Sequence, residues 1–333
     1  MTTLLICVVI ILSVIFIARS IRVMELISEL KPKDDVQEQH KENKWNARIL
    51  LLFLIVMFIY FGYQTFSYAK YLLPVSASKE GAISDKMLWI NFAVIGFVFV
   101  CTQILLFWFG YRYMYQKGKK AFFFTHNNKL EFYWTAVPTV VLLGLIGYGL
   151  KVWYDIMLKP VPENKMVIEI YARQFDFTAR YAGKDNQLGY AYFKLIDGPN
   201  RLGIDSTDKA SHDDILTTEL HLPVNQPILL KMRSQDVIHS TYMPHFRVQM
   251  NNVPGMTTQF CFTPTITTEE MRKITKNPKF DYIMVCNKVC GAAHFGMKMN
   301  VVVESPEQFN QWLGGQQTFI ASMRQQKSTM AMK

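Results

Sequence analysis

Residues 134–153 read WTAVPTVVLLGLIGYGLKVW and residues 175–181 read FDFTARY, and the change of pattern between these two stretches decides the fold. The first stretch has about the 20 apolar residues that a helix needs to cross about 30 Å of hydrocarbon. In the second, Phe175, Phe177, Ala179 and Tyr181 alternate with polar residues, as in a half-buried strand. The sequence therefore predicts a membrane-spanning helix followed by a β domain.

Three more apolar runs precede this stretch, at about 4–18, 49–68 and 88–111. The first run is short, but Arg19 and Arg22 follow it in the manner of a stop-transfer signal, and no positive residue precedes it. These features favour a retained span over a cleaved signal peptide. We therefore expect four membrane spans.

The positive residues between the spans predict the orientation of the chain. Lys and Arg together number seven in 19–48, three in 69–87 and five in 112–130. Because loops on the inner side of a membrane carry the excess of Lys and Arg, we expect both termini and the β domain on the outer side.

Composition and charge exclude several other classes. The chain has 333 residues, of which 50% are hydrophobic and only 19% charged, so it is neither disordered nor collagen-like. Its net charge of +10 arises mainly in residues 1–153, which hold 16 Lys and Arg against 9 Asp and Glu. Because this excess lies between apolar segments rather than in a basic face with aromatics, we expect no nucleic-acid partner.

The region after residue 154 has the signals of an all-β domain. Turn signals separate about seven short strand-like runs in about 150 residues, which indicates a sandwich or a barrel. The polar, basic stretch 266–280 shows no alternation, and we expect a loop there. Residues 305–324 are expected to form a closing helix, which Gly314-Gly315 could break.

The residues suited to chemistry lie in Cys286-Asn-Lys-Val-Cys290-Gly-Ala-Ala-His294-Phe-Gly-Met297. Two thiolates, an imidazole and a thioether are soft ligands, which select copper over magnesium or calcium. A second imidazole, His239, lies 47 residues before Cys286 and can come from a neighbouring loop. The second cysteine permits a sulfur-bridged pair of metals, where a single copper would use one thiolate.

The two cysteines taken alone fit several roles besides copper binding. Cys286 and Cys290 could be packing thiols, a disulfide or half a zinc site. Zinc sites and thioredoxin-type redox pairs usually have two residues between the cysteines, and here there are three. We expect Cys7, Cys101 and Cys261 to be packing groups.

The full pattern closely resembles subunit II of the haem-copper cytochrome c oxidase family. Both Cys286-x3-Cys290-x3-His294-x2-Met297 and Asp236-Val-Ile-His239-Ser240 are similar to the family's copper-binding segments, and Leu130 to Pro138 resembles the start of its second transmembrane helix. The resemblance covers roughly 88–313. It implies an α+β membrane protein, in which transmembrane helical hairpins precede an all-β, cupredoxin-like Greek-key sandwich.

The resemblance also implies a division of the chain into four parts. Residues 1–80 would be an added region with two spans, and 81–155 the transmembrane hairpin usual in the family. Residues 156–305 would form the copper domain, and 306–333 a C-terminal helix and tail. We hypothesise that the two added spans dock a neighbouring complex.

By the same resemblance, the domain binds two copper ions in a dinuclear CuA centre. Cys286 and Cys290 would bridge both ions, His239 and Met297 would complete one site, and His294 with the backbone carbonyl of Lys288 the other. Asp236 would support the ligands through a hydrogen bond. The ammonium group of Lys288 is expected to help keep both thiols ionised.

The implied function is electron transfer in respiration. Electrons would pass from a cytochrome c, or a haem c domain of a neighbouring complex, through CuA to haem in subunit I. There oxygen would be reduced to water and protons translocated across the bacterial inner (plasma) membrane. The expected partners are the haem-bearing subunit I, other oxidase subunits and membrane lipid.

Three departures from the family pattern limit this transfer of function. Lys288 stands where a glutamate commonly binds magnesium, so no magnesium site of the usual form is expected. Phe175 follows Gln174 where a tryptophan commonly accepts the electron, so Phe175 is the expected acceptance point. Residues 154–333 hold 20 Lys and Arg against 17 Asp and Glu, which predicts a dedicated donor rather than a basic soluble cytochrome.

Glu131 resembles the carboxylate near the mouth of the family's proton-uptake path, although a solvated carboxylate is an equal alternative.

Three other protein classes compete with the oxidase interpretation. A quinol oxidase subunit II would have lost the copper ligands, and nitrous oxide reductase would carry propeller repeats. A membrane-anchored thiol oxidoreductase or copper chaperone would hold one copper or none. The chain has no Cys-x-x-Cys-His, so no covalent haem is expected.

Overall fold

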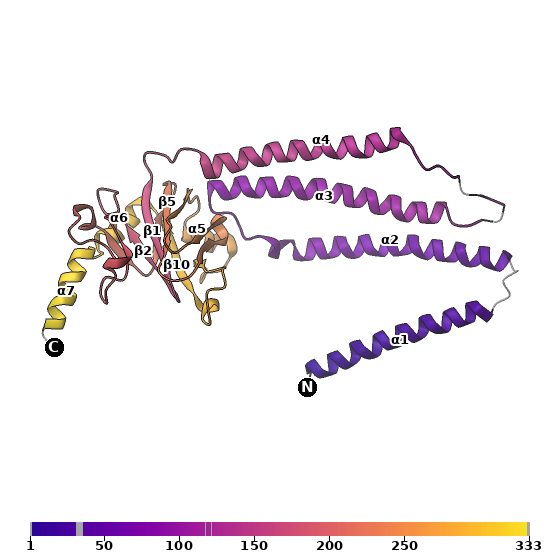
Figure 1. The fold of residues 1–333 in the computed structure, drawn as a ribbon, viewed down its shortest axis with the longest axis horizontal. Coiled ribbons are helices and arrows are strands. Elements are labelled where there is room, and N and C mark those ends of the chain that lie inside the picture. Colours follow the sequence, from indigo (N-terminus) through magenta and orange to yellow (C-terminus); the bar gives the residue numbers. More distant parts are fainter. Residues whose placement is uncertain (1, 31–35, 117, 121, 332–333) are drawn as a thin grey trace. The chain divides into compact units, whose positions relative to one another are not determined.

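The computed structural model describes residues 2–30, 36–116, 118–120 and 122–331 (Figure 1). Four long helices come first in the chain: α1 (Thr2–Leu30), α2 (Val36–Leu72), α3 (Lys79–Arg112) and α4 (Asn128–Trp153). Within these described ranges, three helical stretches are long and apolar enough to span a membrane: His40–Leu72, Lys79–Arg112 and Asn128–Leu158. They contain the expected spans 49–68, 88–111 and 134–153.

The first expected span, 4–18, lies in α1, which is not among these three stretches. Its apolar part is short because Arg19, Arg22 and Glu25 occupy the following turns of the same helix. Arg22 and Glu25 form an exposed ion pair at 2.6 Å, which places charge along the surface of α1. The described residues therefore support three spans, and the fourth stays a prediction.

The chain divides into two compact units. One consists of Met1–Ser67 and Gly96–Asn127, and the other of Tyr68–Ile95 and Asn128–Lys333. In the first unit, α2 contacts α3 through aromatic rings, with Phe61 and Phe99 at 5.4 Å and Phe53 and Phe107 at 5.7 Å between centroids. The second unit contains the whole β domain.

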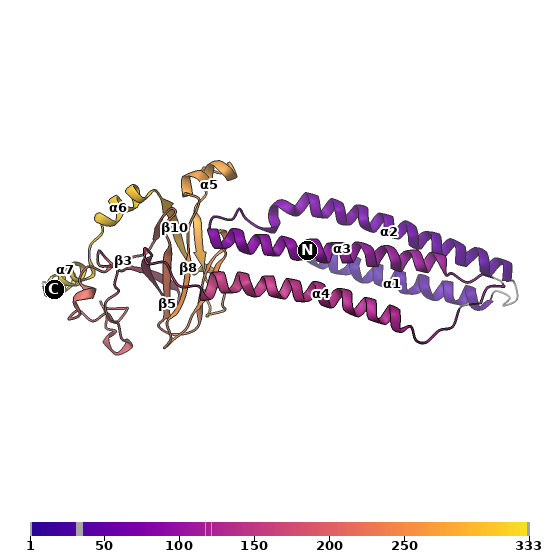
Figure 2. The same cartoon turned by 90° about the horizontal axis from the view of Figure 1, so that it is seen from above.

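The β domain is a sandwich of two five-stranded sheets (Figures 1 and 2). One sheet has the strand order β3-β2-β1-β5-β8 and the other β4-β10-β9-β6-β7. The strands are β1 (Met166–Arg173), β2 (Asp176–Tyr181), β3 (Ile215–Thr217), β4 (Leu220–Pro223), β5 (Ile228–Ser234), β6 (His239–Met243), β7 (Val248–Asn252), β8 (Thr258–Phe262), β9 (Tyr282–Val285) and β10 (Lys298–Glu304).

The core lies between the two sheets and is built from alternating apolar residues. Ile168 and Leu230 contribute from one sheet and Leu222 and Val301 from the other, all without exposed surface. Because successive side chains of a strand point to opposite faces, this alternation directs one face of each sheet inward. The sandwich expected from the sequence is confirmed.

The described residues differ from the sequence expectations in several elements. They contain ten strands where about seven were expected, because β3 and β4 have only three and four residues and are too short to show a period. The expected loop at 266–280 contains helix α5 (Thr268–Thr275), which begins at a capping box between Thr267 and Glu270. This expectation was wrong, since the capping residues were present in the sequence.

The C-terminal region forms two helices instead of one. Helix α6 (Pro306–Gly314) ends at Gly315, and α7 (Phe319–Ala331) follows it. The two glycines therefore break the closing helix, as the sequence had suggested they could. The remaining helical turns are η1 (Tyr154–Leu158), η2 (Phe193–Leu195), η3 (Lys209–Ser211), η4 (Pro244–Phe246) and η5 (His294–Gly296).

A buried ion cluster fastens the β1, β2 and β5 strands together. Arg180 is 1% exposed and pairs with Asp214 at 2.5 Å and with Glu169 at 3.0 Å. Glu169 also pairs with Arg233 of β5. Because a buried charge is stable only when it is paired, these contacts fix the register of the three strands.

The segment that enters α3 is fastened to the β domain. Arg247, which follows η4, donates to both oxygens of Asp85 at 2.8 Å and to the carbonyl of Pro74 at 2.7 Å. The amide of Ala77 donates to the carbonyl of His245 at 2.7 Å. Residues 74–85 are therefore part of the same compact unit as the sandwich.

Candidate metal centre

The expected ligands come from two neighbouring strands of one sheet. His239 begins β6, and Cys286 follows the last residue of β9. These strands are antiparallel, with Tyr242 opposite Val285, so the start of β6 and the residues that follow β9 lie at the same end of the sheet. The loop from β9 to β10 then supplies the remaining expected ligands Cys290, His294 and Met297.

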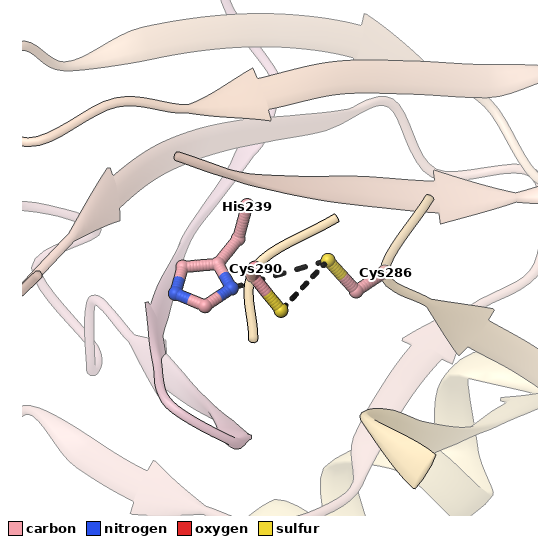
Figure 3. Close-up of side chains that lie close together, drawn as sticks. All are labelled: His239, Cys286 and Cys290. Atoms are coloured by element: carbon pink, nitrogen blue, oxygen red, sulfur yellow. Dashed lines mark hydrogen bonds between the residues drawn. The ribbon is translucent and has the colours of Figure 1, made fainter. Parts of the chain in front are cut away.

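The donor atoms of these residues converge. Cys286 Sγ lies 3.9 Å from Cys290 Sγ and 3.9 Å from His239 Nδ1 (Figure 3). Cys290 Sγ lies 3.5 Å from His294 Nδ1 and 3.9 Å from Met297 Sδ. The ligand atoms of His239, Cys286 and Cys290 all lie within 4.8 Å of one another. Both cysteines are free thiols, which argues against a disulfide between them.

A backbone carbonyl completes the cluster. The carbonyl oxygen of Lys288 lies 3.2 Å from Cys286 Sγ, whereas its side chain is exposed. The structure thus brings together all six residues that the sequence suggested: His239, Cys286, Lys288, Cys290, His294 and Met297. A set of two thiols, two imidazoles, one thioether and one carbonyl fits soft metal ions such as copper.

The donors lie in a largely dry environment. His239 is 0% exposed, Met297 2%, Cys290 5% and Cys286 7%, and His294 is half-buried. Burial, followed by the neighbouring Cys286 thiol, raises the pKa of Cys290 to about 11. The exposed Lys288 ammonium does not offset this rise. Metal binding there must therefore displace the proton of the Cys290 thiol, as is general for thiolate sites.

Asp236 orients the His239 ring. The His239 Nε2 atom lies 2.8 Å from Asp236 Oδ1, so Nε2 donates its hydrogen and leaves Nδ1 with a lone pair facing Cys286. Burial alone would raise the pKa of Asp236, but hydrogen bonds from the Gln174 amide, His239 and the Val237 amide lower it below its usual value. Asp236 is therefore ionised at neutral pH and holds the tautomer that can bind a metal.

Phe175 lies against the cysteine-containing loop. Gly291 has φ of +139°, and a Cβ atom built there would lie 2.9 Å from the Phe175 ring and 2.9 Å from Gln174 Nε2. Only glycine permits both this backbone conformation and this close approach. The structure therefore places the expected acceptance point beside the donor cluster.

Glu131 lies apart from the donor cluster. It occupies the first turn of α4, at the end of a stretch that can span a membrane, and its side chain is exposed. This placement is compatible with a carboxylate at a proton-uptake path and equally with a solvated surface carboxylate.

Sequence reasoning missed two residues that shape this site. Gly291 follows Cys290 directly in the sequence, but its φ of +139° and its contact with the Phe175 turn appear only in the folded chain. The contacts of Gln174 gave no local signal, because its partner Cys290 is 116 residues away in the sequence.

Comparisons with known proteins identify relatives of the chain. The family model of the cytochrome c oxidase subunit II transmembrane domain matches residues 71–152. The model of the periplasmic domain of the same subunit matches residues 204–306. The two matches cover the spans in α3 and α4 and most of the β domain.

Among curated proteins, the chain is similar to the alternative cytochrome c oxidase subunit 2 of Bradyrhizobium diazoefficiens. The two are 33% identical over 246 residues, which cover 73% of this chain and 83% of the relative. Cytochrome c oxidase subunit 2 of Cereibacter sphaeroides is 24% identical, covering 69% of this chain and 76% of the relative. Among solved structures, the periplasmic domain of oxidase subunit II from Bradyrhizobium japonicum matches 46% of this chain and 95% of its own, with 22% identity and a TM-score of 0.32.

Proposed function

The chain belongs to the cytochrome c oxidase subunit II family, and from this premise we propose that its β domain carries a dinuclear copper centre that accepts electrons for the oxidase. The observation that carries the proposal is the convergence of five side-chain donors and one carbonyl at one end of the sandwich. When bound, two copper ions would supply a one-electron relay between a donor protein and haem.

The ligand assignment follows from the family resemblance, in which Cys286 and Cys290 would hold both ions. His239 with Met297, and His294 with the Lys288 carbonyl, would complete the two sites. The contacts support this donor set, since His239 and the Lys288 carbonyl lie beside Cys286, and His294 and Met297 beside Cys290. Asp236 would fix the tautomer of His239, and the buried surroundings would exclude water from the thiolates.

The surface beside the donors is suited to protein contact. The side chains of Val289 and Phe295 are 91% and 92% exposed, and Ile238 is 48% exposed. Exposed apolar residues of this kind, next to an electron-transfer site, favour contact with another protein. We propose that the haem-bearing catalytic subunit and a dedicated haem c donor contact the domain around this loop, with Phe175 on the donor's route.

The chain is a membrane protein whose β domain faces outward, as its family relation indicates. We further propose that α1 forms a fourth span, which would place both termini on the periplasmic side of a bacterial inner membrane. In this proposal residues 1–80 are an added region that docks a neighbouring complex, 81–155 form the hairpin, 156–305 the copper domain and 306–333 the C-terminal helices and tail.

Glu131 is proposed to lie at the mouth of a proton-uptake path. Its position in the first turn of α4, at the end of a membrane span, supports this role. Glu131→Gln should then lower turnover and proton pumping in reconstituted vesicles, while Glu163→Gln, on the loop before β1, serves as a control. Unchanged turnover and pumping in Glu131→Gln would refute the role.

Copper loading tests the proposed function directly. The full chain, purified in detergent and reduced, should bind about two copper ions at the β domain and release protons as it does so, because metal binds the thiolate form of cysteine. The triple substitution Cys286→Ser, Cys290→Ser and His294→Ala should abolish this binding. Binding of one copper, or tight selection of zinc, would contradict the proposal.

A further inference from the structure

The expected metal ligands lie on strands and loops of one sheet. The turn between β1 and β2, which belongs to the other sheet, makes hydrogen bonds to this group of residues. His239 and the cysteine loop belong to β6 and β9, whereas Gln174 lies in the turn between β1 and β2. This turn sits where the two sheets meet at the metal end of the sandwich. Its contacts therefore cross from one layer of the fold to the other.

Gln174 makes two hydrogen bonds that lead to different ligands. Its side-chain Nε2 donates to the carbonyl oxygen of Cys290 at 2.6 Å, and its backbone amide donates to Asp236 Oδ2 at 2.7 Å. The other oxygen of Asp236 lies 2.8 Å from His239 Nε2. A continuous chain of hydrogen bonds thus runs from Cys290 through Gln174 and Asp236 to His239.

The turn that carries Gln174 is itself firmly held. Arg173 donates from Nε and Nη2 to the two carboxylate oxygens of Asp176, at 2.7 and 2.6 Å, across the turn. The amide of Gln235 donates to the carbonyl of Ala172 at 2.9 Å, which ties the segment before Asp236 to the end of β1. The backbone amide of Gln174 is therefore held in one position relative to Asp236.

The cysteine loop has few other supports on its outer side. Val289 and Phe295, which flank Cys290 and His294, are more than nine-tenths exposed and so pack against little of this chain. At Gly291 any Cβ atom would lie 2.9 Å from Gln174 and from the Phe175 ring, so the loop packs on the turn too closely for a side chain. The turn is thus the surface against which the loop rests.

We propose that Gln174 is a positioning residue of the metal centre, which holds the Cys290 and His239 ligands at a fixed separation through one side-chain and one backbone hydrogen bond. The inference rests on the proposed function and deepens it. Because the carbonyl of Cys290 is held, the backbone from which its thiol projects is held as well, which favours a metal site that is formed before metal arrives. A site of this kind loses metal slowly and changes shape little when an electron is added.

The test compares Gln174→Met with the wild-type chain. Methionine keeps the length and shape of the side chain but removes the N–H donor, and it leaves the backbone bond to Asp236 intact. We expect copper release to a chelator to become about 10-fold faster, as for other residues that support metal ligands. The hyperfine pattern of the copper EPR signal should change as well. Gln259→Met, on the exposed face of β8, is the matched control and should change neither.

A second variant separates positioning from simple destabilisation. Asp236→Asn weakens the other end of the hydrogen-bond chain. In the double variant, the increase in the rate of copper release should be smaller than the two single effects combined, because both substitutions break the same connection. Thermal unfolding of the metal-free chains should differ little between Gln174→Met and wild type. The inference would be overturned if Gln174→Met released copper at the wild-type rate with the wild-type EPR spectrum. Additive effects of the two substitutions on the release rate would overturn it as well.

The two proposals fail in different ways. If the proposed function is wrong, the wild-type chain itself will not show a two-copper signal. If only the role of Gln174 is wrong, the wild-type chain will show that signal and Gln174→Met will show it unchanged.

Discussion

The metal end of the β domain and the N-terminal helices α1 and α2 are built in opposite ways. At the metal end the chain itself buries four of the five side-chain donors, and His239 is 0% exposed. Along α2, Phe66 is 86% and Ile59 67% exposed, and α1 shows Phe16 at 72%. The first region is complete within the chain, whereas the second presents apolar surface that lipid or another protein must cover.

The function of the chain is therefore expected to depend on the two regions in different ways. Ligands held by hydrogen bonds and burial keep their geometry whatever surrounds the domain. The described residues of α1 and α2 expose mainly apolar side chains, so we expect the use of these helices to lie in what they contact. Substitutions at the metal end should therefore change electron transfer, and deletions in α1 and α2 should change assembly.

The largest effect should come from Cys290→Ser. Because a serine hydroxyl cannot bridge two soft metal ions, the copper signal should vanish and oxidase turnover should fall by on the order of 100-fold or more, at least the loss seen when residues that only support ligands are changed. Copper analysis and oxygen uptake of the purified complex measure both. Cys261→Ser, on β8, is the control and should retain both properties.

Deleting residues 1–67 should separate the two regions. The cut spares residues 74–85, which Arg247 and its neighbours fasten to the sandwich, so the β domain should fold and keep its copper signal. Association with a neighbouring respiratory complex should be lost, as seen on native gels of solubilised membranes. Recovery of the same assembly from the truncated chain would refute the docking role, and loss of the copper signal would show that the regions are not independent.

A smaller effect should follow from Phe175→Leu. The ring lies on the cysteine loop beside the donors, and removing a central aromatic contact commonly costs enough binding energy to slow transfer about 10-fold. Reduction of the copper centre by the native donor, followed by stopped-flow absorbance, measures the rate. The copper EPR spectrum should stay unchanged. An unchanged rate would mean that electrons reach the centre by another route.

Sequence patterns predicted those parts of this molecule whose cause is local. A strand was expected from the alternation in 175–181, and β2 lies at Asp176–Tyr181. The Cys286, Cys290, His294 and Met297 donors fall within twelve residues of the sequence. Features that depend on distant partners could not be found in this way. Gln174 acquires its role only when folding brings Cys290 to it, and Arg180 is buried only because Asp214 and Glu169 meet it there.

Some misses had a local cause that was overlooked. Thr267 and Glu270 form a capping box that starts α5, and this pattern is legible in the sequence. The short strands β3 and β4 are a different case, because three or four residues do not establish a period and their pairing partners decide their structure.

The smallest effect concerns the pH dependence of the β domain, away from the metal end. Burial, followed by the charge of Arg247, lowers the pKa of His245, whose ring packs against Phe280 and Tyr282. Because the pKa of His245 is lower in the folded chain, the unfolded chain binds the proton more tightly. The contribution of the neutral ring to the free energy of unfolding is therefore fully present above about pH 6.5, and it is lost as pH falls toward the folded pKa.

Denaturant unfolding of the detergent-solubilised chain between neutral and mildly acidic pH measures this effect. Stability should decline toward acid in the wild type, and His245→Gln should decline less over the same range. His212→Gln, at an exposed ring, is the control. Equal slopes for wild type and His245→Gln would show that the buried ring is not the cause.

The EPR spectrum of the copper in the β domain of the purified oxidase tests the dinuclear centre itself, when compared with the same preparation carrying Cys286→Ser. We expect a signal from one unpaired electron shared by two equivalent copper nuclei, which disappears in the variant. A signal from a single copper nucleus, or an identical spectrum in both preparations, would contradict this expectation.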